Sequence, residues 1–156
     1  MAQTITYSPA YTLVPTYECF NRCDYCNFRR DPGTDLWLDL ATARQKLAKL
    51  GRHGVSEILI LSGEVHPHSP HREAWITRIE ELCQLALDLG FFPHTNAGIL
   101  SFTEMARLKQ VNVSLGLMVE QKRNLSVHRH APSKDPQLRL EQLAWAGALK
   151  IPFTTG

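Results

Sequence analysis

Apolar residues recur along this chain in two alternating patterns. Short runs that are rich in β-branched and aromatic residues, or almost wholly apolar, are typical of strands. Longer stretches with apolar residues at helical spacing separate them. The predicted strands cover residues 11–17, 55–61, 91–95, 111–118 and 151–156. The predicted helices cover residues 40–50, 69–89, 101–109 and 136–150, so the expected order is β-α-β-α-β-α-β-α-β.

Capping residues define the expected helix boundaries. Asp39 is a candidate N-cap for the first helix, and Gly51 is the residue expected to end it. Ser69 followed by Pro70 predicts the start of the second helix, with serine as N-cap and proline at the first helical position. Residues 101–104, Ser-Phe-Thr-Glu, form a capping box for the third helix.

Strands that alternate with helices predict a parallel sheet with right-handed crossovers. The repeat of roughly 35 residues is typical of a (β/α) barrel, but a full eightfold barrel needs about 200 residues or more. We therefore expect an α/β fold, a partial (β/α) TIM-type barrel of about four β/α units plus the start of a fifth strand. It would form one domain over residues 1–156. A half barrel leaves a strand edge and apolar faces uncovered, so we expect the isolated chain to be poorly soluble or inactive.

Composition narrows the class of protein. Hydrophobic residues make up 44% of the chain and charged residues 21%, as in an ordinary globular domain. A net charge of +2 without a basic block argues against a nucleic-acid partner. No apolar run reaches about 18 residues, so no membrane-spanning helix is expected. The first four residues lack the features of a signal peptide, which favours a cytoplasmic protein.

Three cysteines lie close together after the first predicted strand. Cys19, Cys23 and Cys26 have the spacing C-x3-C-x2-C, which is too crowded for paired disulfides. Thiolates bind zinc and iron–sulfur clusters, and three of them leave one metal position open for a ligand. We interpret them as ligands of a 4Fe-4S cluster; a zinc site would need a fourth ligand, such as His66. Cys83, inside the second predicted helix, is expected in the core.

Polar residues follow each of the first four predicted strands. Because the carboxyl ends of parallel strands meet at one rim, these residues are expected to form a site. After the cysteines they are Ser62, Gly63 and Glu64, then His66, His68 and His71, then residues 94–98, and finally Glu120 and Gln121. The three histidines could form a second metal site or a solvated loop. Residues 128–130, His-Arg-His, could bind an anion or lie on the surface.

These motifs resemble those of a known superfamily. The cysteine spacing, with Tyr25 before the last cysteine, resembles the signature of the radical S-adenosylmethionine (SAM) enzymes. Residues 62–64, Ser-Gly-Glu, resemble that superfamily's Gly-Gly-Glu segment, with serine in place of the first glycine. Residues 11–23, 60–67, 94–98 and 127–134 are similar to one branch, the synthases of the deazaflavin FO (7,8-didemethyl-8-hydroxy-5-deazariboflavin). The resemblance covers nearly the whole chain but only the first half of the family's barrel.

The resemblance implies roles for the cysteine loop. Cys19, Cys23 and Cys26 would each bind one iron of the cluster, and SAM would bind the fourth iron. Tyr25 would lie near the adenine of SAM.

The resemblance also implies roles for the residues after the later strands. Glu64, with the backbone of Ser62 and Gly63, would hold the methionyl ammonium of SAM. Asn96 and Glu120 are candidates for further polar contacts with SAM or substrate.

The implied reaction is that of a radical SAM carbon–nitrogen lyase. It converts 5-amino-5-(4-hydroxybenzyl)-6-(D-ribitylimino)-5,6-dihydrouracil to FO with loss of ammonia, a step toward coenzyme F420. The implied partners are this small-molecule adduct, a companion FO synthase subunit and a reducing electron donor. Three alternatives remain: a biotin-synthase-like sulfur insertion, the partner FO synthase subunit, and a non-catalytic truncated remnant. Fold alone does not choose between them.

Overall fold

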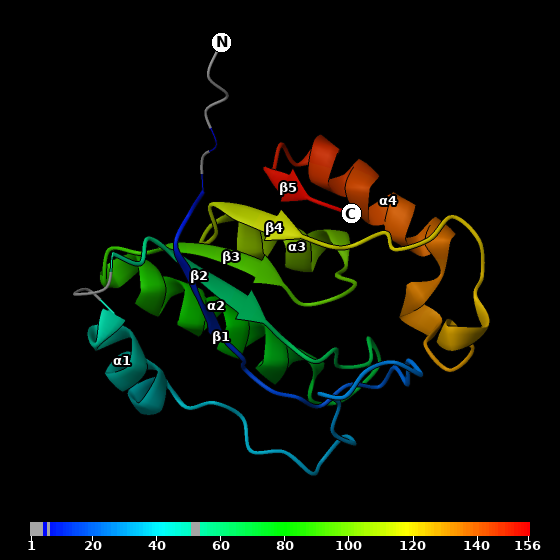
Figure 1. Ribbon diagram of the computed structural model, residues 1–156, viewed down its shortest axis with the longest axis horizontal. Helices are drawn as coiled ribbons and strands as arrows, with labels where there is room; N and C mark the ends of the chain where they lie inside the picture. Colours follow the sequence, from blue (N-terminus) through cyan, green and yellow to red (C-terminus); the bar gives the residue numbers. More distant parts are fainter. Residues whose placement is uncertain (1–4, 6, 51–53) are drawn as a thin grey trace.

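The computed structural model describes residue 5, residues 7–50 and residues 54–156. Within these residues, five parallel strands form one sheet in the order in which they follow along the chain. They are β1 (Ala10–Leu13), β2 (Glu57–Leu61), β3 (Phe92–Asn96), β4 (Ser114–Gly116) and β5 (Phe153–Thr154). Figure 1 shows them side by side from β1 to β5. Gly51, which was expected to end the first helix, and residues 1–4, which were searched for a signal peptide, lie outside the described part.

Each pair of neighbouring strands is joined through a helix. In the described part the helices are α1 (Leu40–Ala48), α2 (Arg72–Asp88), α3 (Phe102–Lys109) and α4 (Pro136–Ala148), together with the short 3-10 helices η2 (Ser126–His128) and η3 (Pro132–Lys134). The predicted order of strands and helices is therefore confirmed, as is the α/β class with a parallel sheet. Among the described residues, no helix is long and apolar enough to cross a membrane.

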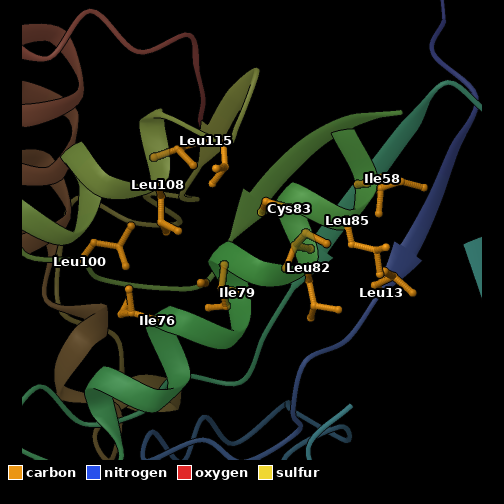
Figure 2. Packing of buried hydrophobic residues seen from close by; sticks show 14 of the residues in the cluster. Leu13, Ile58, Ile76, Ile79, Leu82, Cys83, Leu85, Leu100, Leu108 and Leu115 are labelled. Atoms are coloured by element: carbon orange, nitrogen blue, oxygen red, sulfur yellow. The ribbon is translucent and has the colours of Figure 1, made fainter. Parts of the chain in front are cut away.

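The core lies between the sheet and the helices, and α2 contributes most to it. The inward face of α2 carries fully buried residues at helical spacing, and Cys83 is among them, as predicted. Figure 2 shows Leu82 and Leu85 of α2 near Ile58 of β2 and Leu13 of β1, all in one buried cluster. Trp75 is also fully buried, and Trp145 packs against the cluster from α4.

The opposite face of the sheet is not covered by the helices of the described part. Strand pairing aligns Thr12, Leu59, His94 and Ser114 in one row across four strands. Since side chains alternate along a strand, these point away from the face that carries Leu13 and Ile58. The rows on this face include Phe92, which is 57% exposed.

Several predicted boundaries were wrong. The first strand ends at Leu13 rather than at residue 17, and Pro15, which cannot donate to a ladder, instead accepts a hydrogen bond from the Leu38 amide at 2.8 Å. The strand expected at 111–118 shrinks to Ser114–Gly116, because residues 110 and 111 still belong to the turn that ends α3. The strand expected at 151–156 is only Phe153–Thr154.

Helix starts were predicted better than strand lengths. Asp39 caps α1 by accepting from the Thr42 amide, and the capping box of Ser101 and Glu104 is complete. The Ser69 cap was wrong: α2 begins at Arg72 with His71 in the N-cap position. Ser69 instead closes the preceding turn, where its Oγ and carbonyl oxygen accept from the amides of His71 and Arg72.

Candidate functional site

The carboxyl ends of the strands surround a cleft of about 210 Å³. Of the residues that the sequence linked to a cluster or to SAM, all but Gly63 line it: Cys19, Cys23, Tyr25, Cys26, Ser62, Glu64, Asn96 and Glu120. They come from the end of β3 and from the loops that follow β1, β2 and β4. Gly63 lines an adjoining cleft together with Cys19 and Cys26. The expected convergence at the rim is therefore observed.

The three clustered cysteines carry free thiols. Cys19 and Cys23 are half-buried and Cys26 is exposed. Burial raises the pKa of the Cys23 thiol, and the nearby Lys134 ammonium only partly opposes this. In the described part of the chain, no three His, Cys, Asp or Glu side chains are arranged around a single metal ion. A 4Fe-4S cluster does not require three side chains around one ion, because each thiolate binds a different iron.

The cysteine loop is closed at its base by two acidic residues. Glu18 Oε1 accepts from the Asp35 amide at 3.0 Å, and its Oε2 accepts from the Trp37 indole at 3.2 Å. The Asp35 carboxylate accepts from the Thr16 hydroxyl at 3.0 Å and from the Tyr17 amide at 2.7 Å. These bonds between protein groups join the two ends of the loop across nearly twenty residues.

Gly63 allows the end of β2 to approach this base closely. Its amide donates to the Thr16 carbonyl at 2.8 Å, and a Cβ at this position would overlap the Glu18 carbonyl oxygen. The middle glycine of the Ser-Gly-Glu segment is therefore needed for backbone packing.

Glu64 is the most deeply buried acid of the site, only 4% exposed. Its Oε2 accepts from Asn21 Nδ2 at 3.0 Å and from Ser133 Oγ at 2.7 Å, and its Oε1 accepts from the Ile99 amide at 3.2 Å. Burial raises the pKa of the Glu64 carboxyl, although the bonds from Ser133 and Ile99 oppose the shift. Gly98, with φ of +81°, passes so close that a Cβ would overlap this carboxylate.

A second polar group lies where the segment after β4 meets the cysteine loop. The Tyr25 hydroxyl donates to Glu120 Oε2 at 2.9 Å and lies 2.9 Å from His128 Nε2. Lys134 forms an ion pair with Glu120, and Gln121 Oε1 lies 2.7 Å from His128 Nδ1. Burial raises the pKa of Glu120, but bonds from Lys134 and Tyr25 outweigh it and leave the pKa below its usual value.

Arg72 supports the loops of the site from outside the cleft, and it was not singled out in the sequence. Its guanidinium pairs with Glu104 at 2.7 Å and donates to the carbonyl oxygens of Val65 and Ile99. It also lies 4.4 Å from the centre of the Trp75 ring, so one buried cation supports the loops after β2 and β3 together. An arginine in the first turn of an otherwise apolar helix face was the available signal.

Ser133 and Asn21 were also missed, because neither residue type suggests a buried role. The histidines that follow β2 do not join the cysteines. His66 and His71 line a different cleft, together with Glu18 and Phe20. His66, considered above as a zinc ligand, does not line the cleft that the three cysteines share.

Comparison with known proteins agrees with this geometry. The family model described as the radical SAM superfamily matches residues 13–156. A curated 7,8-didemethyl-8-hydroxy-5-deazariboflavin synthase from Synechococcus elongatus is 68% identical over 155 residues, which are 97% of this chain and 46% of that protein. The protein of the same name from Trichodesmium erythraeum is 62% identical over 159 residues, which cover 100% of this chain and 50% of that protein. The chain thus spans about half the length of these relatives.

Solved structures share the fold. The FeFe-hydrogenase maturase HydG from Carboxydothermus hydrogenoformans superposes with a TM-score of 0.79 at 22% identity, over 96% of this chain and 36% of that one. Methylornithine synthase superposes with a TM-score of 0.74 at 14% identity, over 95% of this chain and 43% of that one. At such identities the likeness concerns the fold alone. Since the family model covers most of its length, the chain belongs to the radical SAM superfamily.

Proposed function

We propose that this chain carries the cofactor-binding half of an FO synthase, a radical SAM carbon–nitrogen lyase. The observation that supports this most directly is the cleft in which the three cysteines meet Ser62, Glu64, Asn96 and Glu120. Identities of 62–68% to curated deazariboflavin synthases favour this branch of the superfamily over the biotin-synthase-like alternative.

Cys19, Cys23 and Cys26 are the residues that would hold the 4Fe-4S cluster. Their thiols are free, and all three line one cleft, so the donor set fits a cluster that keeps one iron open. When bound, such a cluster supplies the electron for reductive cleavage of SAM. A cytoplasmic setting suits this site, because the thiols must stay reduced.

The residues after β2 would orient the methionyl group of SAM. An ionised carboxylate has about four lone-pair sites. Glu64 uses two on Oε2 and one on Oε1 for protein donors, which leaves Oε1 one site for a ligand ammonium. The backbone of Ser62 and Gly63 would complete this contact from the same strand end.

Three further residues complete the proposed contacts. Tyr25 would lie against the adenine, since its ring borders the cleft while its hydroxyl is fixed by Glu120. Glu120, whose pKa is lowered, stays ionised at neutral pH and would hold a polar or cationic part of SAM or substrate. Asn96 borders the same cleft from the end of β3 and offers an amide donor and acceptor.

The proposed substrate is the ribityl-uracil adduct named above, and the product is FO, formed with loss of ammonia. A companion FO synthase subunit would supply the adduct, and a low-potential donor would supply electrons. Because the chain spans about half of its relatives, the remaining part of the barrel would complete the substrate cavity.

Anaerobic reconstitution with iron and sulfide tests the cofactor assignment. We expect about four irons per chain, with an electron paramagnetic resonance spectrum that changes when SAM is added. Cys19→Ala, Cys23→Ala and Cys26→Ala should each abolish the cluster, whereas Cys83→Ala, in the core, should retain it. Stoichiometric zinc without a cluster would contradict the proposal.

The substrate assignment needs a separate test. We expect no turnover by the chain alone, and formation of fluorescent deazaflavin when it is co-expressed with the C-terminal half of the S. elongatus relative. A complex that cleaves SAM but forms no deazaflavin from the adduct would contradict the assigned substrate while leaving the cofactor site intact.

A further inference from the structure

The residues between the three cysteines are held by a distant part of the chain. The Arg22 amide donates to the His130 carbonyl at 2.7 Å, and the Asp24 amide donates to the Val127 carbonyl at 3.0 Å. These two amides lie on either side of Cys23 in the sequence. Their partners belong to the β4–α4 segment, residues 117–135.

The same segment reaches the loop through a buried anchor. Ser133 donates its amide to Asn21 Oδ1 at 3.2 Å and its hydroxyl to Glu64 Oε2 at 2.7 Å, while Asn21 Nδ2 donates to that same oxygen at 3.0 Å. Asn21, Glu64 and Ser133 therefore form a closed triangle, and none of them is more than 4% exposed. Asn21 Nδ2 also lies 3.8 Å from Cys19 Sγ, so the triangle adjoins a proposed iron ligand.

The segment is itself fixed from behind. Arg139 of α4 is buried and donates through Nε to the Ser133 carbonyl at 2.8 Å and through Nη1 to the Met118 carbonyl. This cation thus joins both ends of the β4–α4 segment. At the cleft edge, the bond of Tyr25 to Glu120 adds another contact between segment and loop.

A loop that must present three sulfurs loses conformational entropy when it is ordered. Here Asn21, Arg22, Asp24 and Tyr25 each have a partner in the β4–α4 segment, so hydrogen bonds between protein groups can supply much of that ordering. Contacts that served only general packing would not need to fall on residue after residue between the cysteines.

We propose that Asn21 and Ser133 are positioning residues, which act through Glu64 to hold the cysteine loop in its ligand-binding shape before a cluster is bound. The inference rests on the proposed function only in taking the three cysteines as cluster ligands. The hydrogen bonds that hold the loop join protein groups to one another, so they can be tested in the chain without metal. Glu64 thereby serves the loop on Oε2, while Oε1 retains a site for a ligand donor.

Amide hydrogen exchange of the metal-free chain tests the proposal directly. In the parent chain we expect the Arg22 and Asp24 amides to be protected. Ser133→Ala should speed their exchange about tenfold or more, because the bond it removes reaches a buried carboxyl group. The amides of Ile58 and Ile60 in β2 should exchange as in the parent. Ser126→Ala, which removes an exposed hydroxyl from the same segment, is the matched control and should change neither set.

Asn21→Ala provides a second variant from the other side of the triangle. It should have the same effect as Ser133→Ala, and the double variant should add less than the sum of the two, because both bonds meet at one carboxylate oxygen. After reconstitution, both single variants should lose iron to a chelator faster than the parent and the Ser126→Ala control.

Two results would overturn the proposal. One is unprotected Arg22 and Asp24 amides in the metal-free parent. The other is exchange in both variants that is unchanged, or that rises equally in β2 and in the loop. Because exchange is measured without metal, it decides the positioning role even if the chain binds no cluster, and the reconstitution experiment alone decides that second question.

Discussion

Two buried regions of this chain, the apolar core under α2 and the polar rim above it, are held together by different forces. In the core, residues such as Ile58, Ile79 and Leu82 lie in one cluster and contribute by removing surface from water, which has no preferred direction. In the rim, Asn21, Glu64 and Ser133 are equally inaccessible but meet through three directed hydrogen bonds. Damage to the core should therefore weaken the whole fold, whereas damage to the rim should disorder the site and leave much of the fold in place.

The core side of this comparison gives the largest expected effect. Ile79→Ala removes a fully buried side chain from α2, and we expect the free energy of unfolding to fall by about 2–5 kcal/mol. Urea denaturation followed by circular dichroism measures it. Leu36→Ala, at a side chain that is 95% exposed, should stay within about 0.5 kcal/mol of the parent. Equal losses in both variants would mean that burial does not decide where this fold is stabilised.

A comparison of two glycines tests how closely the backbone at Gly98 approaches the Glu64 carboxylate. Gly90 and Gly98 have φ values of +83° and +81°, so alanine strains the backbone similarly at both. Only at Gly98 would the added Cβ meet the Glu64 carboxylate, whereas Gly90 faces open space. Gly98→Ala should therefore lower the free energy of unfolding by about 1–3 kcal/mol more than Gly90→Ala, and should also impair cluster reconstitution. Matching losses would remove the argument for tight packing around Glu64.

The smallest expected effect is a pH dependence of stability that arises from His94. It is a buried polar residue of β3 whose Nδ1 lies 2.7 Å from Ser114 Oγ. Burial lowers the pKa of His94 below its ordinary value of 6.5, while Glu57 opposes the shift. Below about pH 6.5 the unfolded chain therefore binds a proton that the folded chain does not, so stability should fall as the pH is lowered.

The slope at His94 cannot exceed about 1.4 kcal/mol per pH unit, the limit for one proton. Denaturation midpoints measured between pH 7 and pH 5 would show it. His94→Gln should flatten this dependence, and His130→Gln, at an exposed position, should retain it. A parent-like slope in the His94 variant would assign the dependence to other groups.

The core and the outline of the fold follow from local patterns. The buried face of α2 repeats at helical spacing, and the capping box of Ser101 and Glu104 lies within four residues, so both are visible in the sequence. Strand lengths were harder to predict, because buried apolar residues also lie outside the paired strands. Val111, for example, is buried but precedes β4. The Ser69 cap failed because the same side chain and backbone also close a turn.

The site was predictable only where its residue types are chemically distinctive. Three cysteines at close spacing and an acid after β2 can be recognised in the sequence, and the structure brings them into one cleft. Ser133 and Asn21 carry no such signal, and the bond between them spans 112 positions. Partnerships of that kind depend on how the strands are ordered in space, which no local pattern states.

The base of the cysteine loop, where Glu18 and Asp35 join its two ends, has a consequence for the lifetime of the protein. Small metal domains unfold when their metal leaves, because the metal supplies their folding energy. Here the ends of the loop stay joined through protein groups alone. If a cluster bound at this loop were destroyed by oxygen, these bonds would still join the two ends of the loop, so we expect the same molecule to accept a new cluster without being unfolded first.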